Sequence, residues 1–216
     1  MATDCVFDKE LFQFFKELKR HNDRDWFQEN KERYERFVKR PLAAFAEELA
    51  PRLERIAPGY GYPRLFRIHR DVRFSKDKAP YKTQASVQFQ RALAGSDVHQ
   101  PGFYVHLEPG GCFVGAGIWA PDAAALGRIR AAIVDHPAAW APLAKLPLWG
   151  ESYARPPKGV DPGHRFVEDL KRKHFLTCVD FEDREAIGPG LVRLVERLCR
   201  KGAPLVAFLD RALWQA

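Results

Sequence analysis

Residues 103–119 read FYVHLEPGGCFVGAGIW, and this stretch decides the fold class. Its first half alternates apolar and other residues, which is the period-two pattern of a strand with one buried face. The EPGG turn at 108–111 leads into a second apolar run, so the stretch predicts a β-hairpin. Phe103, Val105 and Leu107 are expected to face inward, and Tyr104, His106 and Glu108 outward.

Alternation continues on both sides of this hairpin. Phe66–Phe74 and Thr83–Gln90 precede it and Phe175–Phe181 follows it, and each run has the length and composition of a strand. Together they predict a mainly antiparallel sheet of about five strands. In the first run Phe66, Ile68, Val72 and Phe74 are expected to face inward; in the second Ala85, Val87 and Phe89 face inward, and Gln84, Ser86 and Gln88 outward.

Helical patterns flank the sheet segment. Apolar residues recur at spacings of three and four over 7–57, where a turn at 21–23 offers Asn22 or Asp23 as a cap and Pro41 suits the first turn of a later helix. Residues 122–135 and 191–214 are also predicted helices. We therefore expect an α+β protein of one domain over 1–216: a helical layer at 7–57, a central sheet at 64–119, and helices, a Pro/Gly-rich loop and a possible last strand at 122–216.

The composition narrows the class of protein. A chain of 216 residues with 46 % hydrophobic content and sixteen Phe has enough apolar surface for a substantial core. Its four cysteines are far apart and form no CxxC pair, which favours reduced, mostly buried thiols. The N-terminus MATDCVFDKE lacks the apolar segment of a signal peptide, and no long apolar run predicts a membrane span, so we expect a cytoplasmic protein.

Positive charge is concentrated in residues 66–83, FRIHRDVRFSKDKAPYKT, and the net charge of the chain is +7. Arg67 and Arg73 are expected to point outward from the predicted strand, with Lys76, Lys78 and Lys82 in the loop at its end. Guanidinium and ammonium groups in such a set suit a phosphate or carboxylate. Asp71 and Asp77 are expected to orient the arginines or accept a proton, and Tyr81 to supply a hydroxyl or a stacking face; the alternative is a solvated sheet edge with a salt-bridged turn.

Other chemistries are less favoured by the pattern. His69 with Asp71, and His106 with Glu108, are possible metal ligands, but their strands are expected to lie about 10 Å apart. The sequence contains no GxSxG motif and no P-loop. Gly115 and Gly117 are expected on the polar face and predict a shallow pocket, rimmed by Arg67, Arg73, Gln84, Gln88, Tyr104 and His106.

The segments FRIHRDVRFSKDKAPYKT, LEPGGCFVGAGIWAP and RPPKG resemble the uncharacterised bacterial and fungal family called domain of unknown function 2461. The likeness covers nearly the whole chain. It implies a site motif of Arg67, Arg70, Asp71, Arg73, Phe74, Ser75, Lys76, Asp77, Lys78, Pro80, Tyr81 and Lys82, to which Arg155, Lys158, Lys171 and Lys173 would add further cations. His69 and Gln84 depart from the family pattern, which weakens the metal interpretation.

The leading hypothesis is therefore a protein that binds a phosphorylated or otherwise anionic small molecule, with Arg73 and Lys78 holding the anion. The alternative is a nonenzymatic binding protein for nucleic acid or an acidic protein partner. The pattern assigns no reaction, no cofactor and no oligomeric state.

Overall fold

The computed structural model describes residues 7–91 and 100–214. Within these ranges six strands form one antiparallel sheet in the order β1-β2-β3-β4-β6-β5. The α+β class and the antiparallel sheet are thereby confirmed, with six strands where about five were expected. The strands are β1 (Tyr62–Leu65), β2 (Ala85–Gln90), β3 (Gly102–Leu107), β4 (Cys112–Ile118), β5 (Leu148–Trp149) and β6 (Phe175–Phe181).

Helices precede, interrupt and follow the strands. The side chain of Asp23 caps α2 as expected, by accepting the Trp26 N–H at 2.9 Å. None of the helices in the described ranges combines the length and apolar composition that a membrane span needs. The helices are α1 (Glu10–Arg20), α2 (Arg24–Glu29), α3 (Lys31–Tyr34), α4 (Arg40–Ile56), α5 (Ala123–Asp135), α6 (Pro137–Trp140), α7 (Val167–Leu170), α8 (Asp183–Ala186) and α9 (Leu191–Trp214), with a π-helical turn η1 (Glu35–Lys39) and a 3₁₀ turn η3 (Leu143–Lys145).

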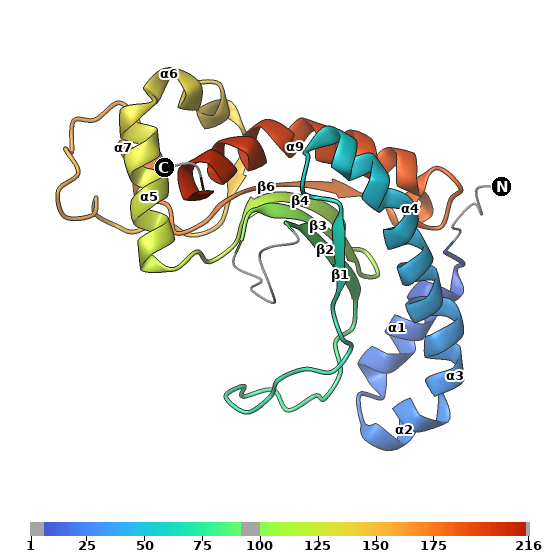
Figure 1. The fold of residues 1–216 in the computed structure, drawn as a ribbon. Helices are drawn as coiled ribbons and strands as arrows, with labels where there is room; N and C mark the ends of the chain where they lie inside the picture. The colour runs from blue at the N-terminus through green and yellow to red at the C-terminus, as the bar shows by residue number, and fades with distance from the viewer. Residues whose placement is uncertain (1–6, 92–99, 215–216) are drawn as a thin grey trace.

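Two long helices, α4 and α9, cover one face of the sheet (Figure 1). Val87, Val105 and Val114 of three successive strands are buried on that face. Helix α9 approaches β4 so closely that a Cβ atom placed on Gly202 would lie 2.2 Å from the Cβ of Ala116. The strands bend, and the face that the helices leave uncovered lies on the inside of the bend (Figure 1).

This second face carries a mixed row of side chains. The register places Arg64, Gln88, Tyr104, Gly115 and Cys178 side by side across five strands. Gly115 therefore shares a face with Tyr104 as predicted. Ser86 and Gln88 also lie on this second face, opposite His106 and Tyr104, as predicted. Both are nevertheless buried, so the second face is not simply exposed to solvent.

The predicted strand at Phe66–Phe74 is wrong. The strand at this sheet edge is β1, which ends at Leu65, and residues 66–84 leave the sheet as a projecting segment that we call the arm (Figure 1). Phe74, predicted to face inward, is 96 % exposed. The alternating sequence pattern continues beyond the end of β1, where the helical layer no longer covers the chain. Phe74 therefore has no core to enter.

Candidate functional site

The arm is the outer part of a long hairpin that begins with β1 and returns as β2. Near its base the two limbs pair through backbone hydrogen bonds from Lys82 N to Ile68 O and from Arg70 N to Pro80 O, both 2.8 Å. Ile68 is buried, so this part of the arm reaches the core. The base of the arm is therefore held by a separate antiparallel bridge, between His69 and Tyr81, beyond the end of the β1–β2 ladder.

Tyr81 anchors the arm to the N-terminal helices. Its ring stacks on Phe27 of α2 with centroids 4.1 Å apart, and it is 6 % exposed. The Asn22 side chain accepts the Tyr81 N–H and donates to the Tyr81 carbonyl, both at 3.0 Å. Tyr81 was predicted to offer a hydroxyl or a stacking face to a ligand; the structure instead places its ring in the core.

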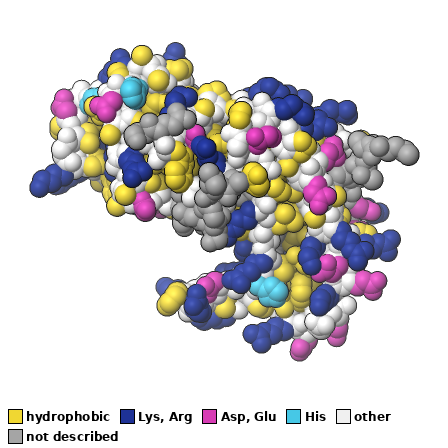
Figure 2. All heavy atoms as spheres, viewed as in Figure 1, with side chains coloured by type: hydrophobic (Ala, Val, Ile, Leu, Met, Phe, Trp, Pro, Cys, Tyr) yellow, Lys and Arg dark blue, Asp and Glu magenta, His cyan; other side chains and the backbone are white. Residues whose placement is uncertain are grey.

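The tip of the arm neutralises most of its own charge. Arg73 forms a two-pronged pair with Asp71, at 2.7 and 3.0 Å, and Arg70 pairs with Asp77 at 2.5 Å. Lys78 donates to the carbonyl oxygen of Val72 at 3.0 Å. Lys and Arg side chains gather along the projecting arm in Figure 2. Arg73 and Lys78, the expected anion clamp, are thus both engaged by the arm itself.

The two acidic residues of the tip are poor proton acceptors. Hydrogen bonds from Arg73 lower the pKa of Asp71 to about 2, and the Ala79 N–H followed by Arg70 lowers the pKa of Asp77. A carboxylate with a depressed pKa is a weak base near neutral pH. Asp71 and Asp77 orient arginines, which is one of the two roles predicted for them.

Arg67 and Lys82 differ from the other cations of the arm. Lys82 is half-buried, and its pKa is lowered first by burial and then by the positive charge of Arg67. Within the described residues neither side chain has a carboxylate within ion-pair distance. The Lys82 ammonium lies over the Phe66 ring, 5.1 Å from its centroid. We call Arg67 and Lys82 the basic corner.

The remaining predicted cations do not converge on this corner. Lys76 is exposed on the tip of the arm, next to half-buried Ser75. Arg155 and Lys158 belong to the loop before α7, which lies at the opposite end of the molecule from the arm (Figure 1). Lys171 and Lys173 pair with Glu168 and Glu151, at 2.9 and 2.8 Å.

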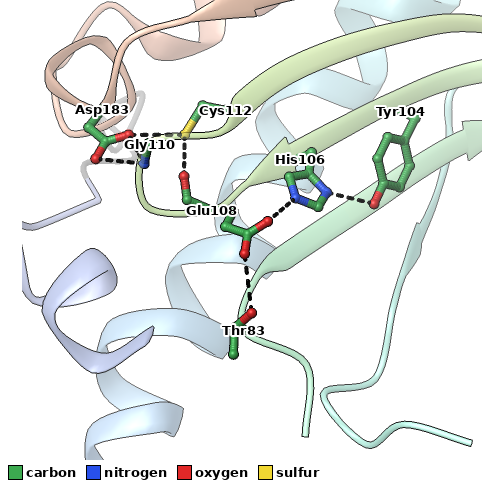
Figure 3. A network of polar contacts seen from close by, with 7 residues as sticks. All are labelled: Thr83, Tyr104, His106, Glu108, Gly110, Cys112 and Asp183. Atoms are coloured by element: carbon green, nitrogen blue, oxygen red, sulfur yellow. Dashed lines mark hydrogen bonds and ion pairs between the residues drawn. The ribbon is translucent and has the colours of Figure 1, made fainter. Parts of the chain in front are cut away.

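A polar network on β3 continues from the base of the arm (Figure 3). Thr83 donates to Glu108 at 3.2 Å, Glu108 contacts His106 Nε2 at 3.2 Å, and His106 Nδ1 lies 3.0 Å from the Tyr104 hydroxyl. Phe66 packs edge-on against Tyr104, with centroids 5.8 Å apart, and so connects this network to Lys82. Carboxylate, imidazole and phenol thus form one hydrogen-bonded chain beside the basic corner.

Burial controls the protonation of this chain. Desolvation lowers the pKa of His106, although Glu108 partly offsets the effect, and desolvation raises the pKa of Tyr104. Both groups are therefore neutral near pH 7, with one His106 nitrogen facing the carboxylate and the other facing the phenol. Nearby Cys112 is no nucleophile at this pH, because burial raises the pKa of its thiol to about 12.

The titration of His106 tests this assignment. We expect its imidazole signals in NMR to titrate with a midpoint below 6.5, and Glu108→Gln to lower that midpoint further, because the carboxylate favours the charged ring. Between the lowered pKa of His106 in the folded protein and its ordinary value of about 6.5, the unfolded state binds more protons than the folded state. The free energy of unfolding is therefore expected to fall as the pH drops below about 6.5. A midpoint above 6.5 in the wild type, or no change in E108Q, would contradict the network.

Comparison with known proteins assigns nearly the whole chain to one family. A family model described as conserved hypothetical protein (DUF2461) matches residues 10–208. The chain belongs to the DUF2461 family. No curated protein matches this sequence. The DUF2461 match includes the arm, the basic corner and the β3 network, so all three lie within the family domain.

The metal alternative finds no support among the described residues of this DUF2461 protein. His69 and Asp71 lie exposed on the arm, whereas His106 and Glu108 lie on and just after β3. Across 7–91 and 100–214, no three His, Cys, Asp or Glu side chains come together in a way that could hold an ion.

Two hollows on the described part of the surface lie away from the basic corner. One of about 450 Å³ is lined by residues of α5 and α9, including Arg128 and Arg211. Another of about 410 Å³ lies between α1 and the start of α8, beside Lys9 and Asp183.

The Tyr104–His106–Glu108 chain was not predicted as a unit. Its signal is present in the sequence, because residues two apart on a strand share a face and YVHLE places a phenol, an imidazole and a carboxylate at that spacing. Thr83 carried no such signal, since its contact with Glu108 depends on how the arm returns to β2.

Proposed function

We propose that this DUF2461 protein binds a phosphorylated small molecule at the basic corner formed by Arg67 and Lys82. The observation that supports this most is the half-buried Lys82 ammonium beside a second cation, without a carboxylate partner in the described part of the chain. Two neighbouring positive charges, one of them partly desolvated, repel each other unless an anion lies between them. A phosphate accepts from the guanidinium fork and the ammonium together.

The adjacent Tyr104–His106–Glu108 chain supplies the acid–base group for any reaction of the bound molecule. A ligand hydroxyl that donates to the Tyr104 oxygen would let the phenol proton move to His106 Nδ1, and Glu108 would stabilise the resulting imidazolium. This assigns proton transfer to β3 and not to Asp71 or Asp77, whose lowered pKa values make them weak bases.

Calorimetric titration with inorganic phosphate and with ribose 5-phosphate at low salt tests the binding proposal. We expect the wild type to bind at least one of them, and Arg67→Ala and Lys82→Ala each to weaken binding about tenfold or more, since each removes a charge-assisted contact. Arg73→Ala is the matched control, because Arg73 is exposed and paired with Asp71. The affinity of this variant for the phosphate is expected to stay within about twofold of that of the wild type.

Equal affinities of wild type, R67A and K82A would rule out the basic corner. The second candidate function is binding of nucleic acid, which the cations of residues 66–83 together with the Phe66 ring would suit. Titration of a labelled single-stranded oligonucleotide at several salt concentrations separates the two, because counterion release gives a steep decrease in affinity with salt for a polyanion that contacts several cations. A steep slope together with no binding of the small phosphates would favour nucleic acid.

A further inference from the structure

A second group of aromatic residues lies at the sheet edge opposite the arm. Trp119 stacks on His174 with centroids 3.9 Å apart and planes 5° from parallel, and its centroid is 5.4 Å from that of Trp149. Trp119 is 46 % exposed and Trp149 is 56 % exposed. Within the described residues Trp119 is the one ring that Trp149 contacts. The stacked pair His174–Trp119 and the tilted neighbour Trp149 therefore form a group of rings that reaches solvent, and we call it the platform.

The backbone is specially shaped to hold the platform. Ala120 has a φ of +46°, a conformation that residues with a side chain rarely adopt, and its N–H donates to His174 Nδ1 at 2.9 Å. Gly150, next to Trp149, has a φ of +112°, and a Cβ atom there would lie 2.7 Å from His174 Cδ2. Unusual backbone follows Trp119 and Trp149 and holds His174 between the two segments, and such backbone is frequent at binding sites.

The charged groups around the platform are already satisfied. Lys173 pairs with Glu151 at 2.8 Å, and Arg130 donates to the carbonyl oxygens of Leu170 and Arg172 at 2.8 and 3.0 Å. Both cations also lie over the ring of Tyr153, within 5.6 Å of its centroid. The rim thus presents a carboxylate–ammonium pair, a phenol and a guanidinium that is held by backbone carbonyl oxygens.

We propose that the platform binds a neutral carbohydrate chain. One face of a pyranose ring carries C–H bonds with slight positive charge, and these pack against the electron-rich face of an indole. Sugar hydroxyls both donate and accept, so they match a rim of carboxylate, ammonium and phenol. A nucleic acid would also stack, but its phosphates need available cations, and here Lys173 is paired with Glu151 while Arg130 is bound to two backbone carbonyl oxygens. This proposal does not rest on the function proposed for the basic corner.

Fluorescence titration with maltoheptaose, cellohexaose and chitohexaose tests the proposal on the full chain. We expect at least one of them at millimolar concentration to change the tryptophan emission, and Trp149→Ala to weaken that binding about tenfold or more. Trp214→Ala is the matched control, because Trp214 is 51 % exposed and makes no ring contact with the described residues of the platform. The affinity of this variant for the sugar is expected to equal that of the wild type.

Thermal unfolding of both variants shows whether they remain folded, which is expected since both indoles are largely exposed. No emission change with any of the three sugars, or equal affinity of W149A and wild type, would overturn the proposal. Tight binding of a single-stranded oligonucleotide that W149A loses would overturn it in favour of nucleic acid.

Discussion

Replacing Gly117 with alanine is expected to lower the free energy of unfolding by about 3 kcal/mol, one of the two largest effects that we anticipate. Gly117 has a φ of +130°, and a Cβ atom there would lie 2.1 Å from the carbonyl oxygen of Phe175. That oxygen belongs to the β6 backbone, which cannot retreat without breaking its pairing with β4. Urea unfolding followed by circular dichroism measures the loss.

Gly127→Ala is the control for this substitution. Gly127 lies on α5, and a Cβ atom there would enter open space among the described residues, so alanine is expected to stabilise the protein by about 0.5–1 kcal/mol through helix propensity. A G117A variant as stable as the wild type would mean that the register between β4 and β6 is wrong. Gly117 precedes Trp119 of the platform by two residues. The G117A substitution is therefore also expected to lower the affinity of the platform for its ligand.

Asp169→Ala is expected to destabilise the protein by about 2–3 kcal/mol. The buried Asp169 carboxylate accepts the indole N–H of Trp140 at 2.9 Å and pairs with Arg172 at 3.1 Å. Trp140 is completely buried, so its N–H would be left without a partner in a dry environment. Thermal and urea unfolding at pH 7 measure the change.

A double-mutant cycle with Trp140→Phe isolates this contact. Phenylalanine has no N–H to satisfy, so Asp169→Ala is expected to cost about 1 kcal/mol less in the W140F background than in the wild type. Strict additivity of the two substitutions would show that the hydrogen bond contributes nothing. Arg172 also donates to Leu148 O at 3.2 Å, so D169A is expected to loosen β5 and the adjacent Trp149.

The elements that sequence reasoning located correctly are those with strong local signals. The β3–β4 hairpin follows from alternation around a Gly-rich turn, and β6 and α9 follow from an apolar run and a long amphipathic stripe. Asp23, one of the two caps that the sequence offered, does cap α2. Each of these outcomes depends on residues within a few positions of one another.

The errors concern partners that are distant in sequence. Tyr81 packs on Phe27, and no local pattern distinguishes such a ring from one that faces a ligand. Among the cations of the arm, the sequence does not indicate that Arg73 and Arg70 meet carboxylates while Arg67 and Lys82 do not, because this depends on how the chain turns between them. The concentration of cations in residues 66–83 is therefore visible in the sequence, whereas the partner of each cation is not.

The order of the strands has a consequence for synthesis of the protein on the ribosome. β4 pairs with β6, which follows it only after α5, α6 and the long loop before α7, and α9 at the end of the chain covers β4. A nascent chain that ends before β6 therefore leaves β4 as an unpaired edge with an uncovered apolar face. We infer that the sheet completes only after most of the chain has been translated.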